Sequence, residues 1–473
     1  MSQPKPIVYV DLDGTLTPSD LLLETALRLV RSNFLYVWLM IGWAMRGAWF
    51  FKQQVFARME LDFAQLPIRD SVVARLREYK ESGHSLVLAS ASPLRDVSKI
   101  ADRLKLFDRV IASEQSNLKG EKKLQAILSD CHGKPFIYLG DAAVDIPIWR
   151  QAQVAIAVNP GRVLAAKARL HGVQLQAIRT QVDVPNAALK AMRPQQWAKN
   201  ALLFLPLMVA HESDLMLWVK VFSVFWAFSL VASSTYIWND LMDLPSDRVH
   251  PRKKNRPMAS GALSIAQALV LMKLVGVAGF VLAWLAGGLP VLLVVTLYTL
   301  ATLLYTFVLK RIAFIDVLTL GLLYTLRVIA GGVAAGLVVS NWLLATSLFV
   351  FLSLALVKRC AELEFLQLEG GQDPQGRGYR MSDLGYLVSM GVSSGFMAVT
   401  VIALYVDSQA GSMLYSQPLF LWGICPVFLY WIMRIWILTS RKEMMDDPVH
   451  FAIHDRVSWC VLAVIALLVW FAS

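Results

Sequence analysis

The chain has 473 residues, 56% of them hydrophobic, and a formal net charge of +11. A soluble chain of this length is seldom so apolar, so the composition favours membrane spans over a wholly soluble protein. The two parts of the chain differ: residues 1–199 have an ordinary soluble composition, whereas residues 200–473 consist mostly of apolar runs. The four cysteines lie far apart and show neither metal-binding nor disulfide spacing. We expect a lipid bilayer as partner and no nucleic acid.

Residues 1–171 predict a soluble α/β domain with a parallel sheet. Four apolar segments are typical of buried strands, namely Ile7 to Val10, HSLVLAS ending at Ser90, PFIYLG before Asp141, and VAIAV. Helical stretches separate the strands, and in such folds ligands bind at the carboxyl ends of the strands. Asp11 and Asp13 follow the first strand at a spacing that points both side chains the same way. Acids, a hydroxyl and a lysine at these strand ends predict a phosphoryl-transfer site.

The motifs DLDGT and GDAAVD, at residues 11–15 and 140–145, together resemble the haloacid dehalogenase (HAD) superfamily. The resemblance implies a Rossmann-like fold with a helical cap at about residues 20–66, and phosphatase activity. It implies that Asp11 is the nucleophile that forms an aspartyl-phosphate, and that Asp13 acts as general acid and then base. The other implied residues are Thr15 and Ser90 for phosphate oxygens, Lys123 or its neighbour Lys122 for charge neutralisation, and Asp141 and Asp145, with Asp11 and the main-chain carbonyl of Asp13, for Mg²⁺. The alternative is an inactive remnant, but every expected chemical group is present.

Within the expected cap, residues 35–51 are unusually apolar. This stretch is short for a span and is interrupted by Arg46, so it predicts a cap that rests on the membrane surface. Residues 172–190 have a mixed composition and predict a linker.

Nine apolar runs predict that residues 191–473 form an all-α polytopic membrane domain of about nine transmembrane helices. The runs are 200–210, 217–238, 267–285, 289–309, 313–337, 341–357, 387–407, 418–439 and 457–472. Lys and Arg concentrate in alternate loops, which by the positive-inside rule places residues 1–199 in the cytoplasm and the C-terminus outside. We therefore expect a multi-pass protein of a bacterial-type inner membrane, with its active sites on the cytoplasmic side.

The segment WNDLMDLPSDRVHPRKKNRPMASG, residues 238–261, combines acids and bases directly after the second run. Asn239, Asp243 and Asp247 are spaced by four residues and share one helix face, and Asp240 lies beside them. Carboxylates this close need a cation, and oxygen ligands suit Mg²⁺. Basic residues follow that would hold the phosphates of a magnesium-bound anion, so the segment predicts a diphosphate site. These basic residues include Arg248, His250, Lys253 and Arg256. The alternative is a basic loop that only sets membrane topology, in which the acids have no role.

Two further polar clusters lie on the same predicted side of the membrane. Arg327 falls inside a predicted span, where an arginine costs roughly 2.5–3.5 kcal/mol to insert and is therefore a functional candidate. The last cluster lies in a Gly-rich loop that is either a closing lid or a plain connector. The candidates for substrate binding are Tyr305, Lys310, Asp316 and Arg327 in one cluster, and Lys358, Arg377, Tyr379 and Asp383 in the other.

The sequences NDLMDLPSDR and HPRKKNRPMASG resemble the first Asp-rich signature of the UbiA prenyltransferase superfamily, whose fold has nine transmembrane helices. RPQQWAKN and YTFVLKRIAFIDV resemble its decaprenyl-phosphate phosphoribosyltransferase branch. The second Asp-rich motif of the aromatic prenyltransferases is not matched, because Asp383 stands there with only Asp373 before it. The resemblance implies that Asp240, Asp243 and Asp247 hold Mg²⁺ and pyrophosphate, with Asn239 beside them, and that Lys199, Arg256 and Lys310 hold phosphates.

Together the two resemblances predict a bifunctional enzyme with one Mg²⁺ site in each domain. The membrane domain would move phosphoribose from phosphoribosyl pyrophosphate to a polyprenyl phosphate, and the HAD domain would remove the 5-phosphate from the product. One alternative is an aromatic prenyltransferase that uses a prenyl diphosphate and carries a phosphatase of separate substrate. Another is a transporter for a lipid-linked sugar, which has no need of a metal–diphosphate site.

Overall fold

The computed structural model describes residues 5–114, 117–180, 182–368, 373, 378–409, 414–444 and 447–473. The chain divides into two compact units. Unit 1 comprises Met1–Ala191 and Ile237–Leu271, and unit 2 comprises Met192–Tyr236 and Met272–Ser473. Unit 1 is therefore discontinuous in sequence, because it includes the acidic and basic segment that follows the first long membrane helix.

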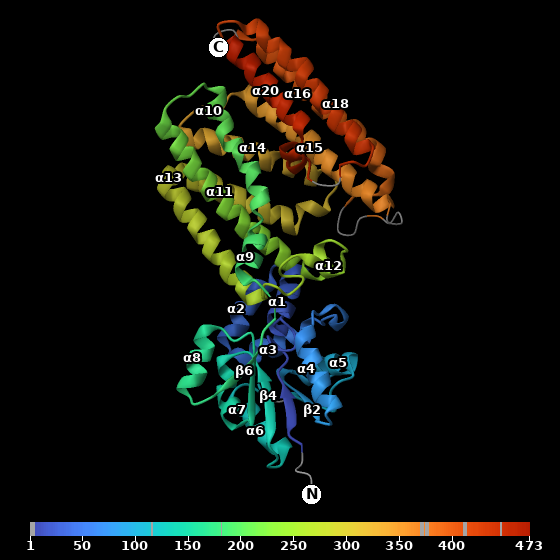
Figure 1. The fold of residues 1–473 in the computed structure, drawn as a ribbon. Coiled ribbons are helices and arrows are strands. Elements are labelled where there is room, and N and C mark those ends of the chain that lie inside the picture. Colours follow the sequence, from blue (N-terminus) through green and yellow to red (C-terminus); the bar gives the residue numbers. More distant parts are fainter. Residues whose placement is uncertain are drawn as a thin grey trace. The chain divides into compact units, whose positions relative to one another are not determined.

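Unit 1 is built on a six-stranded parallel sheet (Figure 1). The strands are β1 (Ile7–Val10), β2 (Leu86–Pro93), β3 (Arg109–Ser113), β4 (Phe136–Gly140), β5 (Val154–Val158) and β6 (Leu175–Ile178), in the order β3-β2-β1-β4-β5-β6. The chain winds outward from β1 to β3 and then returns to β4 beside β1. This reversal is the topological switch point at which such sheets bind ligands.

Alternate residues of β1 face two separate cores. Val8 and Val10 pack with the helices α4 (Asp70–Glu81) and α5 (Leu94–Leu104) on one face of the sheet. Ile7 and Tyr9 pack with α6 (Glu121–Cys131), α7 (Ile146–Gln151) and α8 (Arg162–Leu170) on the other. Both faces of the sheet are thus covered, which explains why its central strands are continuously apolar. The Rossmann-like arrangement predicted from the sequence is confirmed.

The cap inserted after β1 is helical. It consists of α1 (Leu21–Ser32), α2 (Tyr36–Met45), α3 (Ala48–Arg58) and the short turn η1 (Phe63–Gln65). Several large apolar side chains of the 35–51 stretch remain exposed, among them Leu35 at 64%, Trp38 at 68% and Met45 at 79%. Their contact with a membrane surface stays a prediction. The predicted linker 172–190 differs from expectation, because it contains the edge strand β6 and most of α9 (Val184–Met192).

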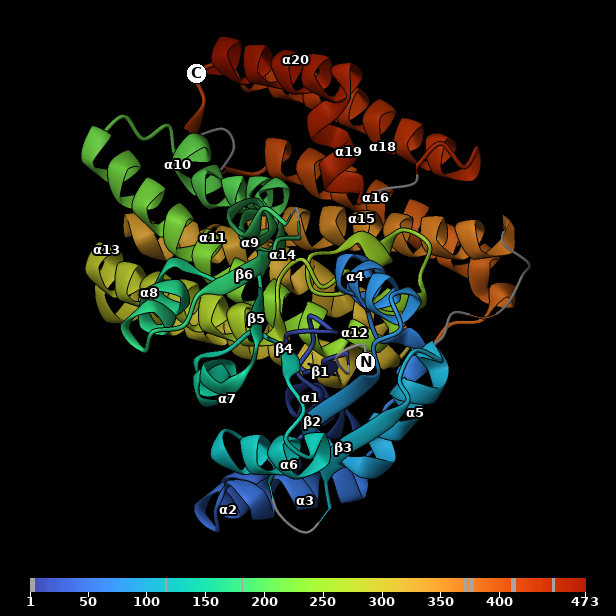
Figure 2. The same ribbon diagram turned by 60° about the horizontal axis from the view of Figure 1, so that its bottom comes forward.

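Unit 2 is helical, and its helices pack in succession (Figure 2). The helix α14 (Ile315–Ala335) contacts α15 (Asn341–Leu368), which contacts α16 (Leu384–Asp407). Next, α16 contacts α18 (Ile424–Ser440), and α18 contacts α20 (Arg456–Ala472). The short segments η3 (Pro194–Phe204) and α10 (Leu205–Val209) also lie against α14.

Six helices in the described part of the chain are long and apolar enough to cross a membrane, and a bent pair, α19 (Pro448–His454) with α20, makes a seventh if it is one span. The chain is thus a polytopic membrane protein. Nine continuous spans are not confirmed. The first predicted span, 200–210, is part of η3 followed by the five-residue α10 rather than one long helix. The third and fourth are merged in α13 (Ile265–Phe307), which breaks at Gly288, where φ is 64°. Only glycine adopts this conformation at little cost.

Candidate active sites

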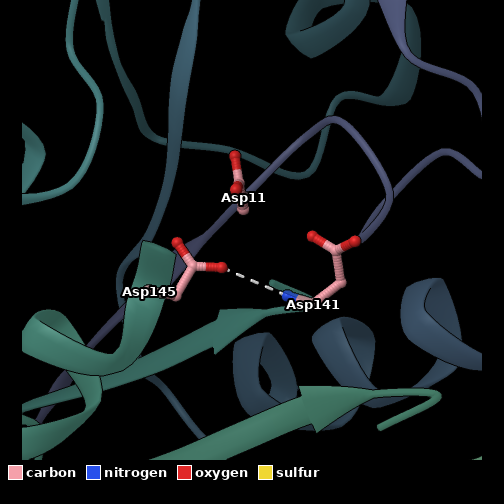
Figure 3. A group of neighbouring side chains, drawn as sticks. All are labelled: Asp11, Asp141 and Asp145. Carbon is pink, nitrogen blue, oxygen red and sulfur yellow. Dashed lines mark hydrogen bonds between the residues drawn. The ribbon is translucent and has the colours of Figure 1, made fainter. Parts of the chain in front are cut away.

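Three aspartates meet at the carboxyl edge of the sheet, where β1 and β4 lie side by side. Asp11 follows β1, Asp141 follows β4, and Asp145 ends the turn η2 (Ala143–Asp145). One ligand oxygen of each lies within 4.8 Å of the others. The main-chain N–H of Asp141 donates to the Asp145 carboxylate at 3.3 Å (Figure 3). Three of the four predicted metal ligands are thus brought together by their side chains.

The chemistry of this group fits a divalent cation. Burial, and next the charge of Asp11, raises the pKa of Asp141 to about 7 and that of Asp145 to about 6. Carboxylates held this close resist ionisation unless a cation neutralises them, and carboxylate oxygens are the ligands that Mg²⁺ prefers. Asp11, Asp141 and Asp145 would therefore hold such an ion.

Lys123, rather than Lys122, is the lysine that reaches this site. The Lys123 Nζ lies 2.8 Å from Oδ1 of Asp11, and its side chain is buried on the inner face of α6. The neighbouring Lys122 is exposed. A buried ammonium at this distance lowers the cost of charge on Asp11 and on a phosphoryl group bound to it. The geometry thus resolves the choice left open by the sequence.

The side chain of Asp13 is held by one hydrogen bond from the cap and one from β2. Its Oδ1 accepts a hydrogen bond from the Leu21 N–H at 2.9 Å, and its Oδ2 accepts one from the Ser92 hydroxyl at 3.0 Å. Burial, followed by the charge of Asp20, raises the pKa of Asp13 to about 7. A carboxyl group with this pKa can give up and take back a proton near neutral pH, as a general acid and base requires.

The two predicted phosphate-binding hydroxyls lie beside the acids. The Thr15 hydroxyl donates to Oδ1 of Asp141 at 3.3 Å. The Ser90 side chain is buried and accepts a hydrogen bond from the Ser92 N–H, while Ser92 lines the open cavity. Ser92, two residues beyond Ser90 on the same strand, is thus a second candidate for contact with phosphate, and the role of Ser90 stays a prediction.

A cavity of about 740 Å³ opens over Asp11, Asp13, Asp141 and Lys123. Its walls include residues that sequence reasoning missed, because they belong to no recognised motif. These are the cap residue Lys52, the basic residues Arg69, Lys119 and Arg179, and the segment from Gly261 to Gln267. Lys52 is buried, and its Nζ donates to the Ala91 carbonyl and to Asn117. The cavity is large enough for more than a single phosphate group.

The acid-rich segment forms a second polar cluster in unit 1. The guanidinium of Arg256 donates to Oδ1 of Asp240 at 2.9 Å and to Oδ2 of Asp247 at 2.6 Å. Burial raises the pKa of Asp247, and Arg256 opposes this shift. The cation between these acids is therefore a guanidinium. Among the described residues, only Asp11, Asp141 and Asp145 bring three acidic ligand atoms together, and the magnesium site at Asp240, Asp243 and Asp247 stays a prediction.

Arg248 makes a buried contact with the cap. Its two terminal nitrogens donate to both carboxylate oxygens of Glu24, at 2.6 and 3.0 Å, and one of them also donates to Ser19 at 3.0 Å. The side chains of Arg248 and Glu24 are only 4% and 2% exposed. A guanidinium engaged in this way acts as a structural contact, which the sequence analysis did not anticipate because it had no partner for Glu24. The predicted phosphate contact of Arg248 stays a prediction.

Unit 2 contains a cationic pair joined by an acid that the sequence analysis did not select. Asp447, before α19, accepts hydrogen bonds from Lys199 at 2.7 Å and from Lys358 at 3.1 Å. Burial alone would raise the pKa of Asp447, but the two lysines outweigh it and hold the pKa well below its usual range. The Nζ of Lys199 also lies 5.6 Å from the Tyr324 ring centroid. No local motif marks Asp447, because its partners lie far away in the sequence.

Three predicted substrate ligands in unit 2 make buried contacts within the protein. Arg327 is buried and donates to Asn200 and to the Tyr298 hydroxyl, each at 2.9 Å. Asp316 is fully buried, lies 2.7 Å from Arg359 and accepts a hydrogen bond from the Tyr379 hydroxyl. The contact of Asp316 with Arg359 joins α14 to α15, and the substrate-binding roles of Arg327, Asp316 and Tyr379 stay predictions.

The remaining candidates stay predictions. Asp383 caps the short turn η6 (Met381–Asp383) by accepting from the Arg380 N–H at 2.8 Å, and Nδ1 of His250 accepts from the main chain at Arg252 and Lys253. Arg377 lies outside the described residues. Partly exposed positions are occupied by Asn239, Asp243, Tyr305 and Lys310, whereas Lys253 is exposed.

Comparisons with known proteins match both units. Residues 8–150 match the haloacid dehalogenase-like hydrolase family, and residues 201–454 match the UbiA prenyltransferase family. The protein y4nM of Sinorhizobium fredii is 33% identical over 96% of this chain and 89% of its own length. Nodulation protein NoeC of Azorhizobium caulinodans is 35% identical over 58% of this chain and 89% of its own. Decaprenyl-phosphate phosphoribosyltransferase of Mycobacterium tuberculosis is 31% identical over 57% of this chain and 88% of its own.

The HAD match contains the three-acid group, and the UbiA match contains Arg256 as well as Asp447 with its partner Lys358. The chain therefore belongs to the UbiA prenyltransferase family and carries a HAD hydrolase domain at its N-terminal end.

Proposed function

We propose that the chain transfers phosphoribose from phosphoribosyl pyrophosphate to a polyprenyl phosphate and then hydrolyses the 5-phosphate of the product. One observation carries this proposal: a phosphatase site and a UbiA domain occur in one chain, and the UbiA domain is similar to decaprenyl-phosphate phosphoribosyltransferases. Covalent linkage keeps the second site at roughly millimolar effective concentration relative to the product of the first.

In the transfer step, an oxygen of the lipid phosphate forms a bond to the anomeric carbon, and the bond from that carbon to pyrophosphate breaks. Negative charge collects on the departing pyrophosphate, so the groups that stabilise it lower the barrier. We assign Mg²⁺ here to the donor as its diphosphate complex, because Arg256 already neutralises Asp240 and Asp247. A magnesium-bound diphosphate would replace this guanidinium contact. Lys199 and Lys358 supply cationic groups for phosphate oxygens.

In the hydrolytic step, a carboxylate oxygen of Asp11 forms a bond to the 5-phosphorus, and the bond from phosphorus to the ribose 5-oxygen breaks. Asp13 gives its proton to that leaving oxygen and later takes one from the attacking water, which releases inorganic phosphate. Lys123 neutralises Asp11 at 2.8 Å. Mg²⁺ held by the three-acid group would balance the charge on the phosphoryl oxygens.

The proposal also includes location. The alternation of basic loops supports a bacterial-type inner membrane with both active sites on the cytoplasmic side, where phosphoribosyl pyrophosphate is available. Labelling of single introduced cysteines with a membrane-impermeant thiol reagent tests this orientation, since a residue of the HAD domain should react only after the cells are opened.

Purified protein in detergent tests both reactions. With phosphoribosyl pyrophosphate, a polyprenyl phosphate and Mg²⁺, we expect pyrophosphate release followed by phosphate release. The Asp11→Asn variant should still release pyrophosphate but should accumulate the 5-phosphorylated lipid. Failure to consume phosphoribosyl pyrophosphate with polyprenyl phosphates of any length would reject the donor assignment. Transfer from a prenyl diphosphate to a phenolic acid would instead support an aromatic prenyltransferase.

A further inference from the structure

The phosphatase cavity has a wall that is distant from its acids in sequence. Gly261, Ala262 and the first turn of α13 up to Gln267 line the cavity together with Asp11 and Asp13. These residues belong to the same compact unit as the HAD domain. They follow the acid-rich segment directly, so one continuous stretch of chain contributes residues both to the acid-rich cluster and to the phosphatase cavity.

A buried ion pair fixes this stretch to the cap. Arg248 lies in the last turn of the short helix α12 (Leu244–Val249) and makes a bidentate contact with Glu24 of α1, as described above. Glu24 is 2% exposed and also lies 3.6 Å from Arg28 of the same helix. A buried bidentate ion pair is more rigid than an exposed one, because both terminal nitrogens of the guanidinium are hydrogen-bonded to the carboxylate. The cap turn η1 contacts α12 as well.

A close backbone approach fixes the other end of the stretch. A Cβ atom on Gly261 would lie 2.3 Å from Cγ of Pro18, a separation that real atoms do not tolerate. The φ angle of Gly261 is +77°, which also favours glycine. Pro18 lines the cavity beside Asp20. The wall is thus held against the rim of the phosphatase site at two points.

We propose that residues 261–267 form the substrate-selecting wall of the phosphatase cavity and that Arg248, at the start of the stretch that leads to it, is the residue that positions it. A small phosphomonoester reaches Asp11 without touching this wall, whereas a substrate with a bulky leaving group packs against it. The wall therefore favours the lipid-linked sugar phosphate over small phosphomonoesters. The identity of that large substrate rests on the proposed function, but the position of the wall does not.

Two pairs of variants of the full-length protein test the proposal. Arg248→Met removes the buried pair, and its control Arg75→Met removes the exposed pair with Glu78, whose residues are 46% and 63% exposed. Gly261→Ala creates the clash with Pro18, and its control Gly172→Ala has nearly the same φ, +73°, with nothing within 4 Å of the added atom. Each control therefore shows the effect of losing an ion pair or a glycine elsewhere in the protein, so that the additional effect of displacing the wall can be recognised.

The first measurement is KM and kcat for p-nitrophenyl phosphate and for the phosphorylated lipid made by the Asp11→Asn variant. We expect both test variants to raise KM for the lipid about tenfold. KM and kcat for p-nitrophenyl phosphate should change less than about twofold, because displacement of the wall misaligns only the large substrate that contacts it. The controls should match the unmodified protein with both substrates. Equal losses on both substrates, or no change on either, would overturn the proposal.

The second measurement does not depend on the substrate. Trypsin cleaves after Arg252, Lys253 and Lys254, which are exposed, and we expect cleavage there to be several-fold faster in Arg248→Met and Gly261→Ala than in the controls, because release of the wall lets this stretch unfold locally more often. If the unmodified protein leaves the lipid intact, the proposed function fails, and the cleavage rates still decide whether Arg248 holds the wall. Unchanged cleavage would reject this role.

Discussion

The ammonium group of Lys199 lies 2.7 Å from Oδ2 of Asp447, a residue 248 positions later in the chain. Both side chains are 10% exposed. Asp447 is also shared with Lys358, so one carboxylate balances two cations. A cationic pair held with a single counter-charge is prepared to accept an anion, because one lysine can exchange its carboxylate contact for a phosphate oxygen.

We expect Asp447→Asn to lower the free energy of unfolding by about 3 kcal/mol at pH 7, because it leaves a buried lysine without its counter-charge. The pKa of Asp447 is lowered in the folded state, so its stabilisation is present above the unfolded pKa of about 3.9 and is lost as the pH falls below that value. The Tm difference from the unmodified protein, measured in detergent, should therefore narrow below about pH 4. The exposed pair offers a control, since Glu78→Gln should change stability by less than about 1 kcal/mol. A Tm difference that is independent of pH would contradict this account.

Lys123→Met should reduce phosphatase kcat by about 100-fold or more, because the ammonium beside Asp11 stabilises charge where the phosphoryl group is transferred. Lys122→Met should change kcat by less than about twofold, since Lys122 is exposed on the same helix. Initial rates of p-nitrophenyl phosphate hydrolysis measure both. A similar reduction of kcat in Lys123→Met and Lys122→Met would show that the contact of Lys123 with Asp11 does not contribute to catalysis.

The pKa of Asp13, about 7, has burial as its largest cause and the charge of Asp20 as the next. The protonated form is the acid that gives its proton to the leaving group, so phosphatase kcat should fall as the pH rises above this pKa. Asp20→Asn removes a like charge and lowers the pKa of Asp13, which should move this alkaline limb to lower pH. Asparagine retains the side-chain oxygen that caps α1, so the helix should be preserved. A pH–rate profile of kcat checks the shift, and a limb that stays in place would exclude Asp13 as its source.

Chelation of divalent cations should abolish phosphate release, because Asp11, Asp141 and Asp145 repel one another without a cation. Asp145→Asn removes one ligand and should raise the Mg²⁺ concentration needed for half-maximal phosphatase rate about tenfold or more. Pyrophosphate release should respond differently, with a magnesium dependence that follows the donor complex and is unchanged by Asp145→Asn. If the Asp145→Asn variant and the unmodified protein show the same dependence of phosphatase rate on Mg²⁺ concentration, the assigned ligand set is contradicted.

The sequence predicted the centre of the sheet well and its edges poorly. The four predicted strands are the central β1, β2, β4 and β5, whose side chains are buried on both faces and are therefore uniformly apolar. The two that were missed, β3 and β6, are the two edges, and both are only partly buried. Their mixed composition carried no strand signal, so β6 was taken for a linker.

The candidate sites divide in the same physical way. Acids that follow a strand directly, such as Asp11 and Asp141, were predicted because a local motif fixes their position. Partners that meet only through tertiary packing were not, as Glu24 with Arg248 and Lys358 with Asp447 illustrate. Charge pattern alone assigned Arg248 and Asp316 to substrate, whereas each is neutralised by a distant side chain.

The discontinuity of unit 1 sets an order of events during synthesis. Glu24 leaves the ribosome 224 residues before Arg248, and α11 (Leu215–Met242) must be made in between. In a nascent chain that stops before α11, Glu24 therefore has Arg28 but not Arg248 as a partner, and the cavity lacks its wall from residues 261–267. If this wall selects the substrate as proposed, a prematurely terminated product lacks the discrimination of the full-length enzyme.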